Sequence, residues 1–89
     1  MATQYPYREI ASGLGFPEGP VVRPDGTVIV CEIKTRCLTA IRPDGGKEVL
    51  VRMEGAPNGA AAGKDGALYI CNNGDGFAWG DPGGVTQPV

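Results

Sequence analysis

Two stretches of this chain decide its fold, because the second repeats the sequence pattern of the first. The first is Gly15-Phe-Pro-Glu-Gly-Pro-Val-Val-Arg-Pro-Asp-Gly-Thr-Val-Ile-Val-Cys-Glu32. The second begins 40 positions later and reads Gly55-Ala-Pro-Asn-Gly-Ala-Ala-Ala-Gly-Lys-Asp-Gly-Ala-Leu-Tyr-Ile-Cys-Asn72. A period of this length, built on apolar strands, is typical of a β-propeller blade. We therefore expect an all-β fold made of antiparallel four-stranded sheets.

The turn signals divide this pattern into strands. A first blade is predicted over about 19–52, with Arg-Pro-Asp-Gly turns at 23–26 and 42–45. Within it, 27–32 is apolar on both faces, as in a covered strand, and 47–52 has the charged ends of an exposed edge. A short strand over 8–12 is predicted to precede this blade.

A second, incomplete blade is predicted over about 58–72, followed by a glycine-rich loop over 73–89. In that loop, Phe77 and Trp79 either line a substrate entrance or pack beneath the loop. Two and a fraction repeats cannot close a ring, so we expect 1–89 to be a partial propeller domain from the N-terminal part of a larger protein. A ring of several copies of this chain is the alternative.

Composition argues against several classes of partner. The net charge is −2 and no basic cluster stands out, which disfavours nucleic acid. No apolar run approaches the length of a membrane span or a signal peptide, so we expect a cytoplasmic protein without a membrane partner. The chain contains no histidine, the commonest general base.

Three cysteines are present, two of them at the matched strand positions Cys31 and Cys71. We expect these two to be buried, reduced core residues rather than a redox or zinc pair, because no Cys-x-x-Cys spacing accompanies them. A disulfide is left open, since pairing cannot be read from spacing alone.

At two equivalent positions, the first repeat has a carboxylate where the second repeat has an amide. Glu18 matches Asn58 at the start of each blade's innermost strand, where both oxygens would face the propeller axis. Oxygen donors select hard cations such as calcium or magnesium. Glu32 matches Asn72 at the end of the second strand, where a turn or strand-end role is favoured over catalysis. The run 72–76 has the look of a calcium loop but lacks the remaining ligands, so a turn is favoured there too.

The run Gly13-Leu-Gly-Phe-Pro-Glu-Gly-Pro-Val-Val-Arg-Pro-Asp-Gly26, together with Ala56-Pro-Asn-Gly59 and Asp65-Gly-Ala-Leu-Tyr-Ile70, resembles the SMP-30/gluconolactonase/luciferin-regenerating-enzyme family. The resemblance covers most of 6–75. It implies a six-bladed propeller that hydrolyses lactones or related esters with one divalent metal in its central tunnel. Calcium is the expected metal, with zinc and magnesium as alternatives.

By the same resemblance, Glu18 is a metal ligand and Asn58 contacts the metal, its water or the substrate. The family's remaining asparagine and its aspartate base come from later blades, beyond residue 89. Sugar-lactone members often carry an arginine at the position of Ala56, which argues against a sugar lactone as substrate here. A strictosidine-synthase-like propeller and a non-enzymatic binding scaffold remain the alternatives to the hydrolase, because propellers host many functions.

Overall fold

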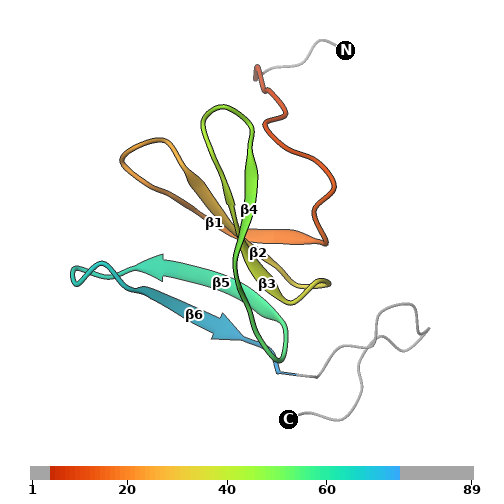
Figure 1. Cartoon of the computed structure of the whole chain (residues 1–89), viewed down its shortest axis with the longest axis vertical. Coiled ribbons are helices and arrows are strands. Elements are labelled where there is room, and N and C mark those ends of the chain that lie inside the picture. Colours follow the sequence, from red (N-terminus) through yellow and green to blue (C-terminus); the bar gives the residue numbers. More distant parts are fainter. Residues whose placement is uncertain (1–4, 75–89) are drawn as a thin grey trace.

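The chain forms two antiparallel β-sheets and, within residues 5–74, which the computed structural model describes, no helix (Figure 1). The first sheet has the order β1-β2-β3-β4 and the second pairs β5 with β6. The strands are β1 (Pro17–Val22), β2 (Val28–Glu32), β3 (Cys37–Ile41), β4 (Lys47–Arg52), β5 (Pro57–Ala62) and β6 (Leu68–Asn72). The predicted all-β, antiparallel fold is confirmed, and the arrangement is consistent with propeller blades. Among these residues no helix is long and apolar enough to cross a membrane.

The same turn closes three of the hairpins within residues 5–74. In each, a glycine with positive φ donates its N–H to the carbonyl three residues earlier, and the aspartate before it accepts an N–H from two residues ahead. Glycine fits this position because it adopts positive φ without steric penalty. The turns are Arg23–Gly26, Arg42–Gly45 and Gly63–Gly66, at the places that the Asp-Gly signals predict.

The strand predicted over 8–12 is absent, and that prediction is wrong. Residues 8–12 have no regular structure and are largely exposed, and no strand among the described residues pairs with them. A strand without a neighbour leaves its backbone groups unpaired, so this short segment does not form one on its own. Lys47 Nζ donates a hydrogen bond to the Ser12 carbonyl, and Arg8, Glu9 and Ile10 line a pocket with residues of the two Arg-Pro-Asp-Gly turns.

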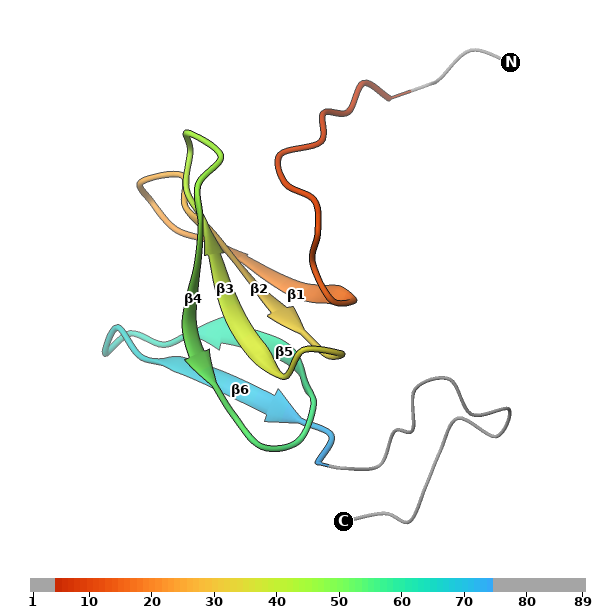
Figure 2. The same ribbon diagram turned by 45° about the vertical axis from the view of Figure 1, so that its right-hand side comes forward.

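The core lies where the two sheets face each other. Figures 1 and 2 show the β5–β6 hairpin lying against the first sheet, and β5 contacts both β1 and β2. The buried cluster of the first sheet comprises Ile29, Cys31, Leu38 and Ala40. Val21, Met53, Ala60, Leu68 and Ile70 pack against it. Strand β3 is buried along its whole length and β4 is exposed along its whole length, as expected for an inner and an edge strand.

Two glycines at equivalent repeat positions make a close approach between the sheets. A Cβ built on Gly19, which has φ +60°, would lie 2.8 Å from the Cα of Gly59 and 3.2 Å from the Asn58 carbonyl oxygen. No real side chain tolerates the first distance, so β1 and β5 meet backbone to backbone. The repeated glycine therefore sets the spacing of the two inner strands.

Gly19→Ala is expected to destabilise the protein more than Gly45→Ala does, by about 1–3 kcal/mol in the free energy of unfolding. Both glycines have positive φ, but a Cβ on Gly45 would meet nothing within 4 Å, so the difference isolates the clash with β5. Urea unfolding followed by circular dichroism measures it. Equal losses in the two variants would show that the β1–β5 contact is not tight.

Candidate functional site

Glu18 and Asn58 lie on β1 and β5, the two strands that meet at Gly19 and Gly59. Glu18 is on β1 with an exposed side chain, and Asn58 is half-buried on β5. Because Gly19 and Gly59 touch, the residues that precede them are on adjoining backbones from different sheets. The structure thus places the two predicted oxygen donors on neighbouring strands, as the repeat requires.

Both donors sit at irregularities in strand pairing. The register of β1 with β2 shifts between Glu18 and Val21, and that of β5 with β6 shifts between Pro57 and Gly59. Asn58 is the residue skipped by the second shift, so it has no direct partner across the hairpin. Bulges of this kind redirect a side chain and are common next to active sites.

The amide oxygen of Asn58 is the most unusual polar atom of this site. Asn58 Oδ1 is buried and accepts no hydrogen bond from any residue within 5–74. Buried polar atoms are nearly always hydrogen-bonded, because leaving one unpaired costs about 1–3 kcal/mol. An orphan acceptor of this kind suits a ligand that carries positive charge or a hydrogen-bond donor.

The residues present fit a hard cation by chemistry but do not complete its shell. Glu18 offers two carboxylate oxygens and Asn58 one amide oxygen, whereas calcium takes about 6–8 oxygen ligands. Within residues 5–74, no group of three or more His, Cys, Asp or Glu side chains could hold a metal ion. A cation bound at Glu18 and Asn58 would therefore need its remaining ligands from water, substrate or other protein groups.

Cys31 lies beside this pair as a buried thiol. Burial raises its pKa, the charges of Glu18 and Cys71 raise it further, and a hydrogen bond from the Gly59 backbone N–H lowers it in part. The net rise keeps the thiol protonated at neutral pH. Cys31 therefore packs as a small apolar group between the two sheets, as the sequence predicts.

Cys71 differs from its repeat partner, and the prediction that it is buried is wrong. Cys71 is exposed, while Cys31 and Cys37 are buried, and all three are free thiols. Strand β5 covers Cys31, but no described strand covers the same face of β6. Equivalent positions in a repeat are equally buried only when each has a neighbouring repeat to cover it.

Glu32 and its counterpart Asn72 brace strand ends, which confirms the role predicted for them. Glu32 is only 5% exposed, and its Oε1 accepts hydrogen bonds from the Gly15 N–H and the Thr35 hydroxyl, both at 2.7 Å. Its Oε2 accepts from the Thr39 hydroxyl and the Cys37 thiol. The carboxylate thus ties the segment before β1 to the β2–β3 connection.

Asn72 stabilises the equivalent strand end in the second sheet. Its Oδ1 accepts the N–H groups of Ala56 at 3.0 Å and Gly74 at 2.7 Å, and its Nδ2 donates to the Glu54 carbonyl at 2.9 Å. Both hydrogen bonds occupy the amide oxygen of Asn72, so this oxygen is not available to bind a cation. This agrees with the turn that the sequence favours over a calcium loop. In the rest of the run 72–76, Asn73 donates its N–H to the Ala56 carbonyl at 2.9 Å and Gly74 has φ +66°, as in a turn. Positions 75–76, Phe77 and Trp79 lie outside the described residues.

One pocket of this structure was not foreseen in the sequence. A groove of about 760 Å³ opens between the two sheets on the side of β3, β4 and β6, and its lining includes neither Glu18 nor Asn58. Its lining combines strand residues such as Ile29, Leu38 and Leu68 with turn residues such as Pro24, Asp25 and Gly66, so only the relative placement of the sheets could reveal it.

Neither a scan against protein-family models nor a search of curated proteins found a match to this chain. The resemblance of its motifs to the lactonase family therefore stays a prediction.

The carboxylate of Glu32 is expected to make stability fall in acid. Burial raises its pKa, but the hydrogen bonds from Thr39, Gly15, Thr35 and Cys37 outweigh burial and hold the pKa below its ordinary value of 4.5. A lowered folded-state pKa means that the stabilisation is present above the ordinary value and is lost as the pH falls through the folded-state value.

Glu32→Gln should therefore reduce stability at neutral pH by about 1–3 kcal/mol and should flatten the loss of stability as the pH falls below the ordinary pKa value of 4.5. Chemical denaturation at a series of pH values tests this, with the exposed Glu9→Gln as the control that keeps the original slope. An unchanged slope in Glu32→Gln would show that another group carries the acid sensitivity.

Proposed function

We propose that this chain is the N-terminal part of a divalent-metal-dependent hydrolase of lactones or related esters, built on a six-bladed propeller. The observation that carries the proposal is the orphan Asn58 Oδ1, buried on β5 next to the strand that holds Glu18. A single repeated position thus gives a carboxylate from one sheet and an unpaired amide oxygen from the next.

The roles of the two side chains follow from their chemistry. Glu18 would bind the cation through its carboxylate, and the exposure of that side chain leaves it accessible to ions. Asn58 would add its amide oxygen, and the cation would relieve the unpaired state of that atom. A bound divalent cation supplies a Lewis acid that polarises the ester carbonyl.

In this proposal, Glu18 and Asn58 bind the cation and orient it toward the ester, and neither residue is the base that activates water. Glu32, the buried carboxylate on β2 opposite Pro17, accepts hydrogen bonds from four donors and cannot also activate water. The proposal therefore assigns the base to protein beyond residue 89. Calcium is the proposed metal, the substrate is a small lactone or ester, and the compartment is the cytoplasm.

Isothermal titration of CaCl₂ into the 89-residue chain tests the site, with Mg²⁺ and Zn²⁺ titrated for comparison. With few protein ligands, binding should be weak, with a dissociation constant on the order of 1 mM. Glu18→Gln should weaken it by at least about tenfold, since even changes around the ligands alter metal affinity 10–100-fold. Asn58→Asp should strengthen it by adding a charged oxygen.

The matched control is Glu9→Gln, which removes a carboxylate from an exposed position of the N-terminal segment. It should leave calcium affinity unchanged. If Glu18→Gln and Glu9→Gln bind calcium equally well, the site is not at Glu18 and the hydrolase proposal loses its support.

A further inference from the structure

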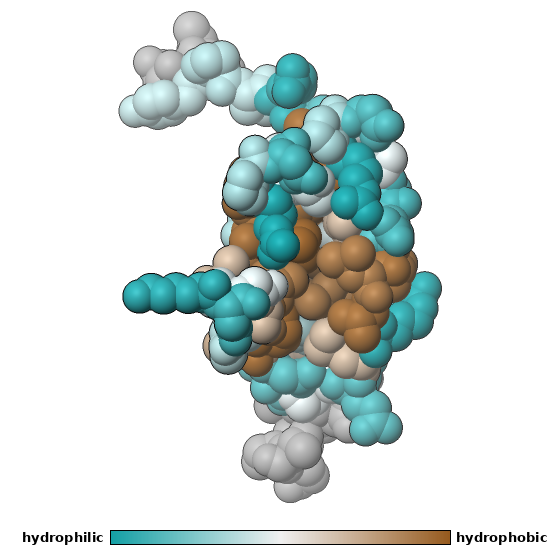
Figure 3. Space-filling view, turned by 60° about the vertical axis from the view of Figure 1, so that its left-hand side comes forward, coloured by the Kyte–Doolittle hydropathy of each residue, from teal (hydrophilic) through white to brown (hydrophobic). Residues whose placement is uncertain are grey.

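The groove between the two sheets is lined by both buried and exposed apolar side chains. Leu38 and Ala40 of β3 are buried where they line it, whereas Leu50 and Val51 of β4 are 43% and 45% exposed. Figure 3 shows hydrophobic side chains gathered on one face of the molecule between polar ends. The volume of about 760 Å³ is within the range of about 300–1,000 Å³ that small-molecule sites occupy.

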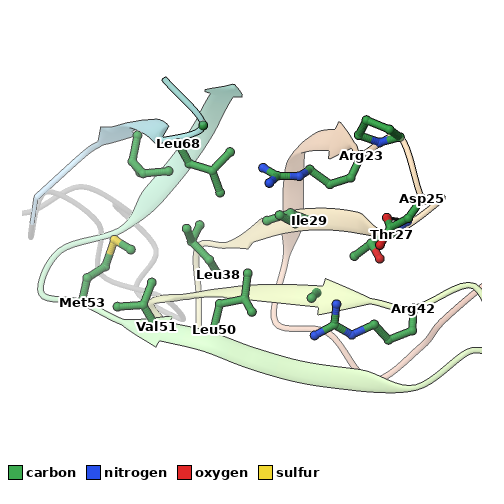
Figure 4. A pocket seen from close by; sticks show the side chains of 14 residues that line it. Arg23, Asp25, Thr27, Ile29, Leu38, Arg42, Leu50, Val51, Met53 and Leu68 are labelled. Atoms are coloured by element: carbon green, nitrogen blue, oxygen red, sulfur yellow. Dashed lines mark hydrogen bonds between the residues drawn. The ribbon is translucent and has the colours of Figure 1, made fainter. Parts of the chain in front are cut away.

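An arginine extends into this groove without a counter-ion. Arg23 follows β1 at the start of the first Arg-Pro-Asp-Gly turn, is half-buried, and in Figure 4 extends into the groove between Ile29 and Leu68. Its guanidinium forms no ion pair or side-chain hydrogen bond with any residue within 5–74. The stem of an arginine packs well on apolar surface, but the charged head needs an acceptor. Arg23 therefore keeps its N–H donors available to a ligand.

The other charged side chains that line the groove have partners. Arg42 forms an ion pair with Glu48, a residue outside the lining. Asp25 is exposed and accepts the Thr27 backbone N–H at 2.9 Å within its own turn. Among the lining residues, the unmatched charge is thus the positive charge of Arg23.

Thr27 brings a second unpaired polar group to the same place. The Arg23 N–H donates to the Thr27 carbonyl at 2.8 Å, so these two residues face each other across the hairpin, and both line the groove. Thr27 is 4% exposed, and its buried Oγ1 has no hydrogen-bond partner within residues 5–74. A hydroxyl donates one hydrogen bond and a guanidinium several, and neither group carries negative charge. An anion is the ligand that this pair of donors complements.

We propose that the groove binds a small organic carboxylate with an aliphatic chain, held at its carboxylate by Arg23 and Thr27. A guanidinium matches the two oxygens of a carboxylate, and this pairing is among the stronger hydrogen-bonded contacts. The aliphatic chain lies along Leu38, Leu50 and Leu68, where its burial is favourable. The walls come from both sheets, which suits a free molecule rather than a flat membrane surface. The two proposed metal ligands do not line the groove, so this inference is independent of the metal site.

Isothermal titration of decanoate into the 89-residue chain tests the proposal, with butanoate and decyltrimethylammonium as comparison probes. Decanoate should bind at least about tenfold more tightly than butanoate, because its longer chain buries more apolar surface. Decyltrimethylammonium has the same chain with the opposite charge. It should bind at least about tenfold more weakly than decanoate, because Arg23 would repel it.

Arg23→Gln should weaken decanoate binding by about tenfold or more, since it removes the charged donor. Arg52→Gln is the matched control, because it removes the same charge from an exposed position of β4 that lines the pocket on the opposite face. Val51→Asp should also weaken binding, whereas Val49→Asp should not. These two valines have nearly equal exposure, 45% and 42%, but only Val51 lines the groove. Circular dichroism and urea midpoints establish that each variant is folded.

Four outcomes would overturn the proposal. Two need no variant: an absence of decanoate binding, and equal affinities for decanoate and decyltrimethylammonium. The third is equal decanoate affinity in folded Arg23→Gln and Arg52→Gln. The fourth is an affinity that falls as the protein concentration rises, because a second copy of the chain would then cover the groove. Calcium affinity should be the same in Arg23→Gln as in the wild-type chain, which separates this test from that of the metal site.

Discussion

The contact on which the rest of this structure depends is the approach of two backbones at Gly19 and Gly59. A Cβ on Gly19 would lie 2.8 Å from the Cα of Gly59, so the two inner strands can meet only because side chains are missing there. That contact places the Gly59 N–H at the Cys31 thiol and brings the β5–β6 hairpin over the core of the first sheet. It also brings Glu18 and Asn58 onto adjoining backbones.

A carboxylate in the first sheet is matched by an amide in the second at two repeat positions. The hydrogen bonds of these side chains show that the two positions have different roles. Glu32 and Asn72 have their oxygens occupied by backbone and side-chain donors, so they act as internal braces. Asn58 has a buried oxygen without any donor among the described residues, and Glu18 is exposed. A satisfied oxygen stabilises the fold, whereas an unsatisfied one stores a cost that a ligand can remove. This contrast is the physical basis for the proposal that a divalent cation binds at the inner strands.

Much of the fold was predictable because the repeat combines strand patterning with turn chemistry. The Asp-Gly turns and the apolar run at β2 have local causes, and the structure contains them where the sequence indicates. The errors share one cause, which is that burial depends on neighbours. A strand over 8–12 needs a partner strand, and Cys71 needs a covering sheet, and neither neighbour is present among the described residues. The groove was missed for the same reason. At the candidate site, the motifs gave the residue types, but only the structure revealed the orphan oxygen.

Paramagnetic relaxation with Mn²⁺ tests the central claim most directly, because it locates a bound cation instead of only detecting one. In a ¹⁵N correlation spectrum of the chain at low Mn²⁺, the account predicts that signals of Glu18, Gly19, Asn58 and Gly59 broaden first and together, although they come from strands of different sheets. Broadening that instead starts at the exposed carboxylates of the Asp-Gly turns, and spares Glu18 and Asn58, would contradict it.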